Sequence, residues 1–240
     1  MKLPYNQSFH VHQKQEIIII WCAKAACTTV NYMFFEHENL LKKALKTSSW
    51  IHTYRKEYQQ IHSTIRDYAI FNYSNSKYIQ FSVNPYRRAV SSYIHGMKSN
   101  YINDSKKNIS FQKFLEYLND EKIEPNSHHN LQTFYKNNYD KINVVHMENM
   151  KHDLKKINNK FKLHYKPYSN QNVKIKSNKF NRFIGKDNWD TIKDNIPNDY
   201  TLFYNAKNKR LVERLYKEDI KNLGYTWEMF IEYEERKKSI

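Results

Sequence analysis

The sequence predicts an α/β fold in which a central parallel sheet is flanked by helices. Three apolar segments have the length of strands, and each is followed by a segment whose apolar residues recur at helical spacing. This alternation is typical of parallel sheets, because their strands are joined by crossover helices. The chain has 240 residues, 40% of them hydrophobic, which is enough to bury a sizeable core. We expect one domain that covers residues 1–240.

The first strand–helix unit begins with Glu16–Cys22, a continuous run of mostly β-branched residues. A continuous run predicts a strand that is buried on both faces of a parallel sheet. A short loop of small residues follows, and Thr28–Lys46 then has apolar residues at roughly helical spacing. We expect the loop at the carboxyl edge of the sheet, where ligands bind in open α/β folds.

Two further strand–helix units are expected downstream. The pattern predicts a strand over Lys77–Val83 and a helix over Tyr86–Met97. Pro85 favours a helix start there, because the N–H that proline lacks would be unpaired at that position. A third strand over Ile142–Met147 and a third helix over Met150–Asn158 repeat the order.

The remaining segments are predicted from their composition. Residues 1–15 are expected to form an N-terminal extension, and residues 158–188 a long basic surface loop rich in Lys and Asn. Leu202–Leu223 is expected to close the fold as a helix, with Gly224 as its C-terminal cap.

Charge and cysteine content narrow the class of partner. The net charge of +16 favours an anionic partner such as a nucleotide or an anionic polysaccharide, and charge alone supports a nucleic-acid binder as one alternative. Cys22 and Cys27 are too few for a disulfide framework, and no Cys/His set has zinc spacing, so we expect no metal.

The apolar run Ile17–Cys22 is too short for a signal peptide or a membrane span, so we expect a soluble, cytoplasmic protein of unknown oligomeric state.

The loop between the first strand and the first helix, within Trp21–Val30, has the features of an anion site. Backbone N–H groups and the helix dipole favour an anion at a helix N-terminus. Lys24 adds a positive charge, and Thr28 and Thr29 add hydroxyl donors. The signature GxxxxGK[ST] is missing, which disfavours an ATP or GTP hydrolase and a P-loop kinase.

Residues 24–29, Lys-Ala-Ala-Cys-Thr-Thr after an apolar strand, resemble the 5′-phosphosulfate loop of the sulfotransferases that use 3′-phosphoadenosine 5′-phosphosulfate (PAPS). The resemblance is closest to the Golgi carbohydrate branch (the chondroitin, dermatan and heparan 2-O type), although Ala23 stands where that loop usually has Pro. It implies a P-loop-like three-layer sandwich with a central parallel sheet. It also implies that PAPS binds at six residues: Lys24, Ala25, Ala26, Cys27, Thr28 and Thr29.

A second segment, Phe81–Tyr93, resembles the 3′-phosphate motif of the same family, R-[DN]-P-[YFW]-x-R-x-x-S-x-Y. The positions in register are Asn84, Pro85, Tyr86, Arg88, Ser91 and Tyr93. The resemblance implies that Ser91 donates to the 3′-phosphate. The leading arginine of the motif is Val83 here. Either Arg87 or Arg88 therefore binds the phosphate instead, or the affinity is reduced, or the protein is a binding-only relative.

Sulfuryl transfer requires a base for the acceptor hydroxyl and a cation beside the leaving phosphate. The resemblance implies that Lys24 is the cation. His62 precedes the second motif much as the catalytic histidine does in the heparan 2-O-sulfotransferase-like branch, so His62 is the predicted base and His52 is the alternative.

A third segment, Ser127–Asp153, resembles the acceptor side of the carbohydrate branch. Its matching residues are His129, Gln132, Tyr139, Asp140, Ile142, Glu148 and Asp153. His129 and Gln132 are secondary site candidates, and Glu148 is interpreted as a solvated helix residue.

The sequence thus predicts a sulfotransferase that moves the sulfuryl group of PAPS to a carbohydrate hydroxyl by in-line transfer. A small-molecule or tyrosine sulfotransferase is an alternative on the same scaffold. A second alternative is a catalytically degenerate relative that binds a nucleotide or a sulfated glycan.

Overall fold

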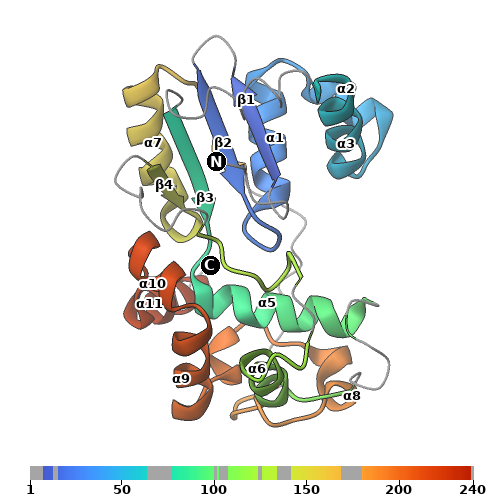
Figure 1. Ribbon diagram of the computed structural model, residues 1–240, viewed down its shortest axis with the longest axis vertical. Helices are drawn as coiled ribbons and strands as arrows, with labels where there is room; N and C mark the ends of the chain where they lie inside the picture. Colours follow the sequence, from blue (N-terminus) through green and yellow to red (C-terminus); the bar gives the residue numbers. More distant parts are fainter. Residues whose placement is uncertain are drawn as a thin grey trace. The chain divides into compact units, whose positions relative to one another are not determined.

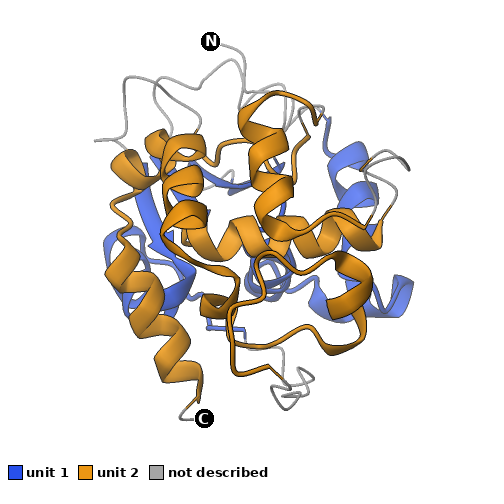
Figure 2. Cartoon of the chain, turned by 90° about the horizontal axis from the view of Figure 1, so that it is seen from below, with its two compact units in different colours: residues 1–83, 134–171 blue, residues 84–133, 172–240 orange. Residues whose placement is uncertain are grey.

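A computed structural model (Figure 1) describes residues 8–12, 16–63, 77–99, 102, 108–123, 126–133, 142–168 and 180–238. The chain divides into two compact units (Figure 2). Unit 1 comprises Met1–Val83 and Phe134–Gln171, and unit 2 comprises Asn84–Thr133 and Asn172–Ile240. Each unit has a hydrophobic core of its own. The expectation of one domain stays a prediction.

Unit 1 contains a four-stranded sheet in the order β1-β2-β3-β4 (Figure 1). The strands are β1 (Ser8–His12), β2 (Ile17–Trp21), β3 (Lys77–Ser82) and β4 (Ile142–His146). β2, β3 and β4 are parallel, and β1 pairs with β2 in the antiparallel direction. The predicted α/β class, with a mostly parallel central sheet flanked by helices, is confirmed.

The antiparallel edge strand β1 corrects the expectation that residues 1–15 form an extension. Its apolar residues, Phe9 and Val11, pack with β2, while His10 and His12 on the opposite face are buried. His10 stacks on Phe34 with a centroid distance of 3.9 Å. The sequence does not predict this strand, because the two histidines at its buried positions make its pattern look polar throughout.

The continuous apolar run of β2 is buried on both faces, as predicted. Ile17, Ile19 and Trp21 belong to the main core of unit 1, together with side chains of four helices. Ile18 and Ile20 point to the other face, where they pack with Tyr78. The helices of unit 1 within the described residues are α1 (Cys27–His37), α2 (Leu41–Thr47), α3 (Ile51–Ile61), the 3₁₀ turn η4 (Met147–Asn149) and α7 (Met150–Phe161).

The prediction of one continuous helix over Thr28–Lys46 is wrong, because α1 ends at His37 and α2 begins at Leu41. Asn39 between them has a φ of 58°, in the left-handed region that ends a helix. Asn tolerates this region better than most residues. The backbone conformation of one residue therefore ends the helix, although the apolar residues keep their helical spacing beyond it.

Unit 2 consists of helices and connecting segments in the described residues. They are α5 (Pro85–Lys98), α6 (Phe111–Asn119), α8 (Trp189–Ile192), η5 (Lys193–Asn195), η6 (Tyr200–Phe203), α9 (Ala206–Leu215), α10 (Lys217–Leu223) and α11 (Trp227–Lys238). Aromatic side chains dominate the core of this unit, and Tyr93 contacts both Phe111 and Phe203. The helix predicted after Pro85 is confirmed.

The single helix predicted over Leu202–Leu223 is also interrupted. Asn205 is extended and caps α9 by accepting the N–H of Asn208, and Tyr216 leaves helical geometry between α9 and α10. Gly224 has a φ of 69° and forms the predicted left-handed cap. No described helix is long and apolar enough to cross a membrane.

The predicted basic loop, residues 158–188, is described only in part. α7 extends to Phe161, three residues beyond its predicted end, and residues 169–179 lie outside the described part of the chain. Asn188 at the end of the segment forms an isolated bridge with Ser110.

Candidate functional site

The loop that links β2 to α1 in unit 1, residues 22–29, has an unusual backbone for a segment without glycine. Lys24 and Ala26 both have positive φ values, of 62° and 63°, and the N–H of Ala25 donates to the Cys22 carbonyl at 3.1 Å. A left-handed conformation costs a residue with a side chain about 1–2 kcal/mol. Such strain is concentrated at ligand sites, where the surrounding structure holds it in place.

Residues with positive φ alternate along this loop with a residue that lacks it. Lys24 and Ala26 have positive φ, while Ala25 between them does not. Alternation of this kind produces the concave arrangement of N–H groups that binds anions. The loop can therefore bind a phosphate-like group with its backbone, although it lacks the glycines of the usual phosphate loop.

The N-terminus of α1 adds to this anion site. No side chain caps the helix at Ala26, and its first turn contains no acidic residue. Uncapped N–H groups and the positive end of the helix dipole favour a bound anion. Thr28 and Thr29 lie in this first turn, and both residues are partly exposed. All six loop residues that the sequence selected thus lie together in unit 1.

His52, at the start of α3, lies beside the loop. Its Nε2 is 3.1 Å from Oγ1 of Thr28. Burial, followed by the charges of Arg55 and Lys56, lowers the pKa of His52 to about 4, so its imidazole is neutral at pH 7. An anion bound at the loop would raise this pKa, because it would offset the two positive charges.

Arg55 is a cationic residue of this region that sequence reasoning missed. It interacts electrostatically with Cys27, and it donates from an Nη1 hydrogen to Oγ of Ser8 at 2.7 Å. It belongs to none of the three motifs, because it lies on α3, 26 residues after the loop ends. Its position one helical turn from His52 is the signal that could have found it.

His62 lies at the other end of α3, where it is the C-cap residue. It lies ten positions after His52, which corresponds to about 15 Å along the helix axis. Its ring packs on Tyr58 with a centroid distance of 4.3 Å. The structure therefore brings His52 to the loop and leaves His62 away from it, while the catalytic role of His62 stays a prediction.

Val83, which replaces the leading arginine of the second motif, is 5% exposed at the end of β3. It forms a small apolar cluster with Cys22 and Ala25, against which Met147 packs. The position is therefore an apolar support for the loop in this chain. Its side chain supplies no donor for a phosphate.

The remaining residues of the second motif lie on α5 in unit 2. Asn84 caps this helix by accepting the N–H of Tyr86 at 3.1 Å, and its amide donates to the Thr226 carbonyl at 3.1 Å. Ser91 lies two turns into the helix and is partly exposed. Ser92 beside it is buried and donates to the His128 carbonyl.

Arg88 is completely buried on α5. Its guanidinium donates to the carbonyls of Asn130, at 2.6 Å, and Ser127, at 3.3 Å. Arg87 lies 3.4 Å from the Glu234 carboxylate and 4.8 Å from the centre of the Tyr233 ring. Both arginines are therefore engaged inside unit 2, and their predicted contact with a phosphate is not tested by this geometry.

The acceptor-side candidates form part of the same scaffold. The backbone N–H of Gln132 donates to Asp219 at 2.8 Å, and Tyr216 donates to the His129 carbonyl at 2.9 Å. Burial raises the pKa of Asp219, and the charge of Arg88 opposes this shift. Asp219 was not singled out from the sequence, since an acidic residue beside Glu218 on a helix gives no signal of such a role.

Of the remaining residues of the third motif, the structure describes some and leaves others out. Glu148 lies in η4. The Asp153 carboxylate accepts the backbone N–H of His146 at 3.0 Å, and it also lies 2.9 Å from Nδ1 of the same histidine. Tyr139 and Asp140 lie outside the described residues.

Comparison with known proteins tests the overall interpretation. A family model described as the sulfotransferase family matches residues 7–226. Searches among curated proteins and among solved structures found no significant match. The family match covers β1 to Thr226 and includes the loop, α3 and α5.

Proposed function

Since the chain belongs to the sulfotransferase family, we propose that it transfers the sulfuryl group of PAPS to a hydroxyl group of a carbohydrate acceptor. The observation that carries the proposal is the 22–29 loop. It combines two left-handed residues, an uncapped helix N-terminus and Lys24, all of which favour a phosphate-like anion. PAPS supplies the transferable group and, as the leaving group, the 5′-phosphate of 3′-phosphoadenosine 5′-phosphate (PAP).

Lys24 is the residue we assign to the leaving group. Its ammonium would stabilise the negative charge that develops on the phosphate oxygen as the S–O bond breaks. The acceptor oxygen forms a new bond to sulfur, the electron pair of the broken bond stays on the phosphate, and the hydroxyl proton passes to a base. As in phosphoryl transfer, positioning and electrostatics would supply most of the rate.

A histidine of α3 is the proposed base. The contact with Thr28 supports His52, whereas the family resemblance supports His62. A base must be neutral to accept a proton, and the lowered pKa of His52 keeps it neutral at pH 7. A pKa near 4 also makes His52 a weak base, and the negative charge of a bound nucleotide would correct this by raising it.

Ser91 and Arg88 are the residues that the family motif assigns to the 3′-phosphate. The partial exposure of Ser91 is compatible with this role. For Arg88 the structure supports a second reading, in which its bonds to two carbonyls position the 127–130 segment. The apolar burial of Val83 supports reduced 3′-phosphate affinity, and hence the alternative of a binding-only relative.

Thermal unfolding with PAP, ATP and GTP tests the nucleotide site. At about 100 times its dissociation constant, a ligand adds about 2.7 kcal/mol to the free energy of unfolding. We expect PAP to raise the melting temperature, GTP to have no effect, and Lys24→Ala to weaken the response to PAP. Lys43→Ala is the matched control, because Lys43 is an exposed lysine of α2 and should leave the response intact.

Transfer of label from PAPS to a panel of acceptors then separates the alternatives. Label on oligosaccharides supports a carbohydrate sulfotransferase, and label on phenols or tyrosine peptides favours the alternative acceptors. PAP binding without transfer to any acceptor would indicate the binding-only relative. A protein that gives no response to PAP at millimolar concentration would contradict the nucleotide site altogether.

A further inference from the structure

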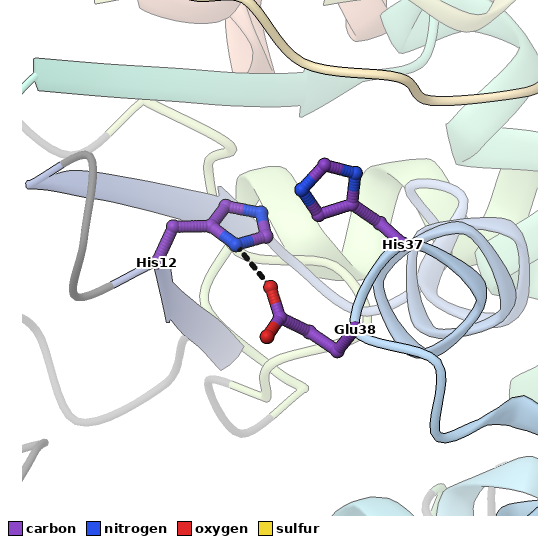
Figure 3. Close-up of side chains that lie close together, drawn as sticks. All are labelled: His12, His37 and Glu38. Atoms are coloured by element: carbon purple, nitrogen blue, oxygen red, sulfur yellow. Dashed lines mark hydrogen bonds and ion pairs between the residues drawn. The ribbon is translucent and has the colours of Figure 1, made fainter.

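A second cluster of polar side chains lies in unit 1, at the end of α1 that is remote from the 22–29 loop. Figure 3 shows His12, from β1, with His37 and Glu38, from the C-terminal end of α1, turned toward one another. Their candidate ligand atoms all lie within 4.8 Å of one another. The site was invisible in the sequence, because 24 residues separate His12 from the other two.

The close contacts within the cluster join β1 to α1. Nδ1 of His12 lies 2.6 Å from Oε1 of Glu38, and the rings of His12 and His37 are 4.9 Å apart in a T-shaped arrangement. A hydrogen bond between His12 and Glu38 explains two members of the cluster. His37 completes the cluster, and its ring also packs against Tyr165 with a centroid distance of 5.1 Å.

We propose that His12, His37 and Glu38 bind a divalent transition-metal ion, for which Zn²⁺ is the best chemical match. Two imidazoles and one carboxylate are a donor set that Zn²⁺ accepts, with water in the fourth position. Hard ions such as Mg²⁺ prefer oxygen ligands and are expected to bind poorly.

The geometry requires a small adjustment to hold the ion. Tetrahedral ligands about 2.0–2.1 Å from Zn²⁺ lie about 3.3 Å from one another. The carboxylate of Glu38 must therefore withdraw from His12 by less than about 1 Å, and ligand atoms that now lie up to 4.8 Å apart must approach one another by as much as about 1.5 Å. Glu38 can do so, because its side chain is 35% exposed at the C-cap of α1.

The surroundings of His12 favour a fixed ligand. Its side chain is fully buried, and its Nε2 is hydrogen-bonded to the hydroxyl of Tyr165. A partner on one ring nitrogen fixes the orientation and tautomer of a ligating histidine, which leaves Nδ1 directed at the ion.

The ion would stabilise the fold and take no part in sulfuryl transfer. α1 begins at the 22–29 loop and has 11 residues, so the cluster at its far end lies about 16 Å along the helix from that loop. A metal there would join the edge strand β1 to α1. The inference is therefore independent of the proposed nucleotide site.

Metal binding to the untagged full chain is the test. After removal of metals with a chelator, we expect about one equivalent of Zn²⁺ to bind in competition with a chromophoric chelator, and the melting temperature to rise with Zn²⁺ and stay unchanged with Mg²⁺. Co²⁺ in place of Zn²⁺ should give the visible absorption of a four-coordinate site. Binding to folded protein at [Zn²⁺] well above the dissociation constant accounts for the rise.

Variants assign the ligands. We expect His37→Ala and Glu38→Gln each to weaken Zn²⁺ binding at least about 10-fold and to remove the Co²⁺ absorption. These two residues are only partly buried, so their variants should fold, unlike variants of the buried His12. His152→Ala is the matched control, since His152 is exposed on α7 and should retain full affinity. Failure of the parent chain to bind Zn²⁺, or unchanged affinity in both variants, would overturn the proposal.

Discussion

At the scale of single residues, the histidines of α3 carry the sharpest question about catalysis. Nε2 of His52 lies 3.1 Å from Oγ1 of Thr28, and burial, followed by the charges of Arg55 and Lys56, lowers the pKa of His52. His62 caps the same helix about 15 Å away by the rise of an α-helix. His52 has the contact with the loop, whereas His62 has the position in the sequence that the family resemblance favours.

Asparagine variants of the two histidines distinguish them. If His52 is the base, His52→Asn should lower kcat by about 10²–10⁴-fold, and His62→Asn should change it by no more than a few-fold. The measurement is the steady-state rate of label transfer from PAPS, with PAP affinity as the check that the fold is intact. The reverse pattern would assign the base to His62.

The pH dependence gives a second readout of the same assignment. A base is active when deprotonated, so kcat/KM for PAPS should be level near pH 7 and fall as the pH drops through the pKa of the free protein. For His52 that pKa is about 4, below the ordinary value of 6.5. An acid limb near pH 6.5 would contradict His52 as the base.

At the scale of elements, buried charges connect segments that have little sequence signal. Arg88 of α5 donates to the carbonyls of Ser127 and Asn130, and Asp219 of α10 accepts the N–H groups of Gln132 and Thr133. The 126–133 segment is thus held by two helices of unit 2. These bonds supply partners for backbone groups in a segment without regular secondary structure, where unpaired buried groups would be costly.

Loss of Arg88 should destabilise the protein more than loss of an exposed arginine. Arg88→Met leaves two carbonyls without their donor and Asp219 without a nearby cation, so we expect the free energy of unfolding to fall by about 3 kcal/mol. Urea denaturation is the measurement. Arg210→Met, at an exposed position on α9, should cost less than about 0.5 kcal/mol. Equal stability of the two variants would show that Arg88 does not position this segment.

At the scale of the whole molecule, the net charge of +16 is expected to affect the binding of an acceptor more than the fold. We expect binding of an anionic polysaccharide such as heparin to weaken at least about 10-fold between about 50 and about 200 mM salt, because bound counterions are released from a polyanion. A neutral polysaccharide should show no such dependence. Titration at several salt concentrations measures the slope, and a flat response for heparin would remove charge as an argument for an anionic acceptor.

The sequence alone predicts the α/β class and the three parallel strands, which the structure confirms, and it predicts the 22–29 loop as an anion site. These features depend on local composition, since a continuous apolar run defines a buried strand and the order strand, loop, helix places the loop. The family match over residues 7–226 agrees with that interpretation. The same local patterns missed β1 and the breaks after His37 and at Tyr216, because polar core residues and single backbone angles leave little trace in periodicity.

Tertiary structure alone decided which distant side chains meet. It placed His52 beside Thr28, buried Val83 against Ala25, engaged Arg88 with backbone carbonyls, and joined His12 to Glu38 across 26 residues. Sequence spacing cannot reveal such pairs, because they depend on how strands and helices pack. The pair of His12 and Glu38, for example, depends on the register of β1 on β2 and on the point where α1 ends. The chemistry of this chain therefore has a local part, the loop, and a non-local part that the packing of strands and helices creates.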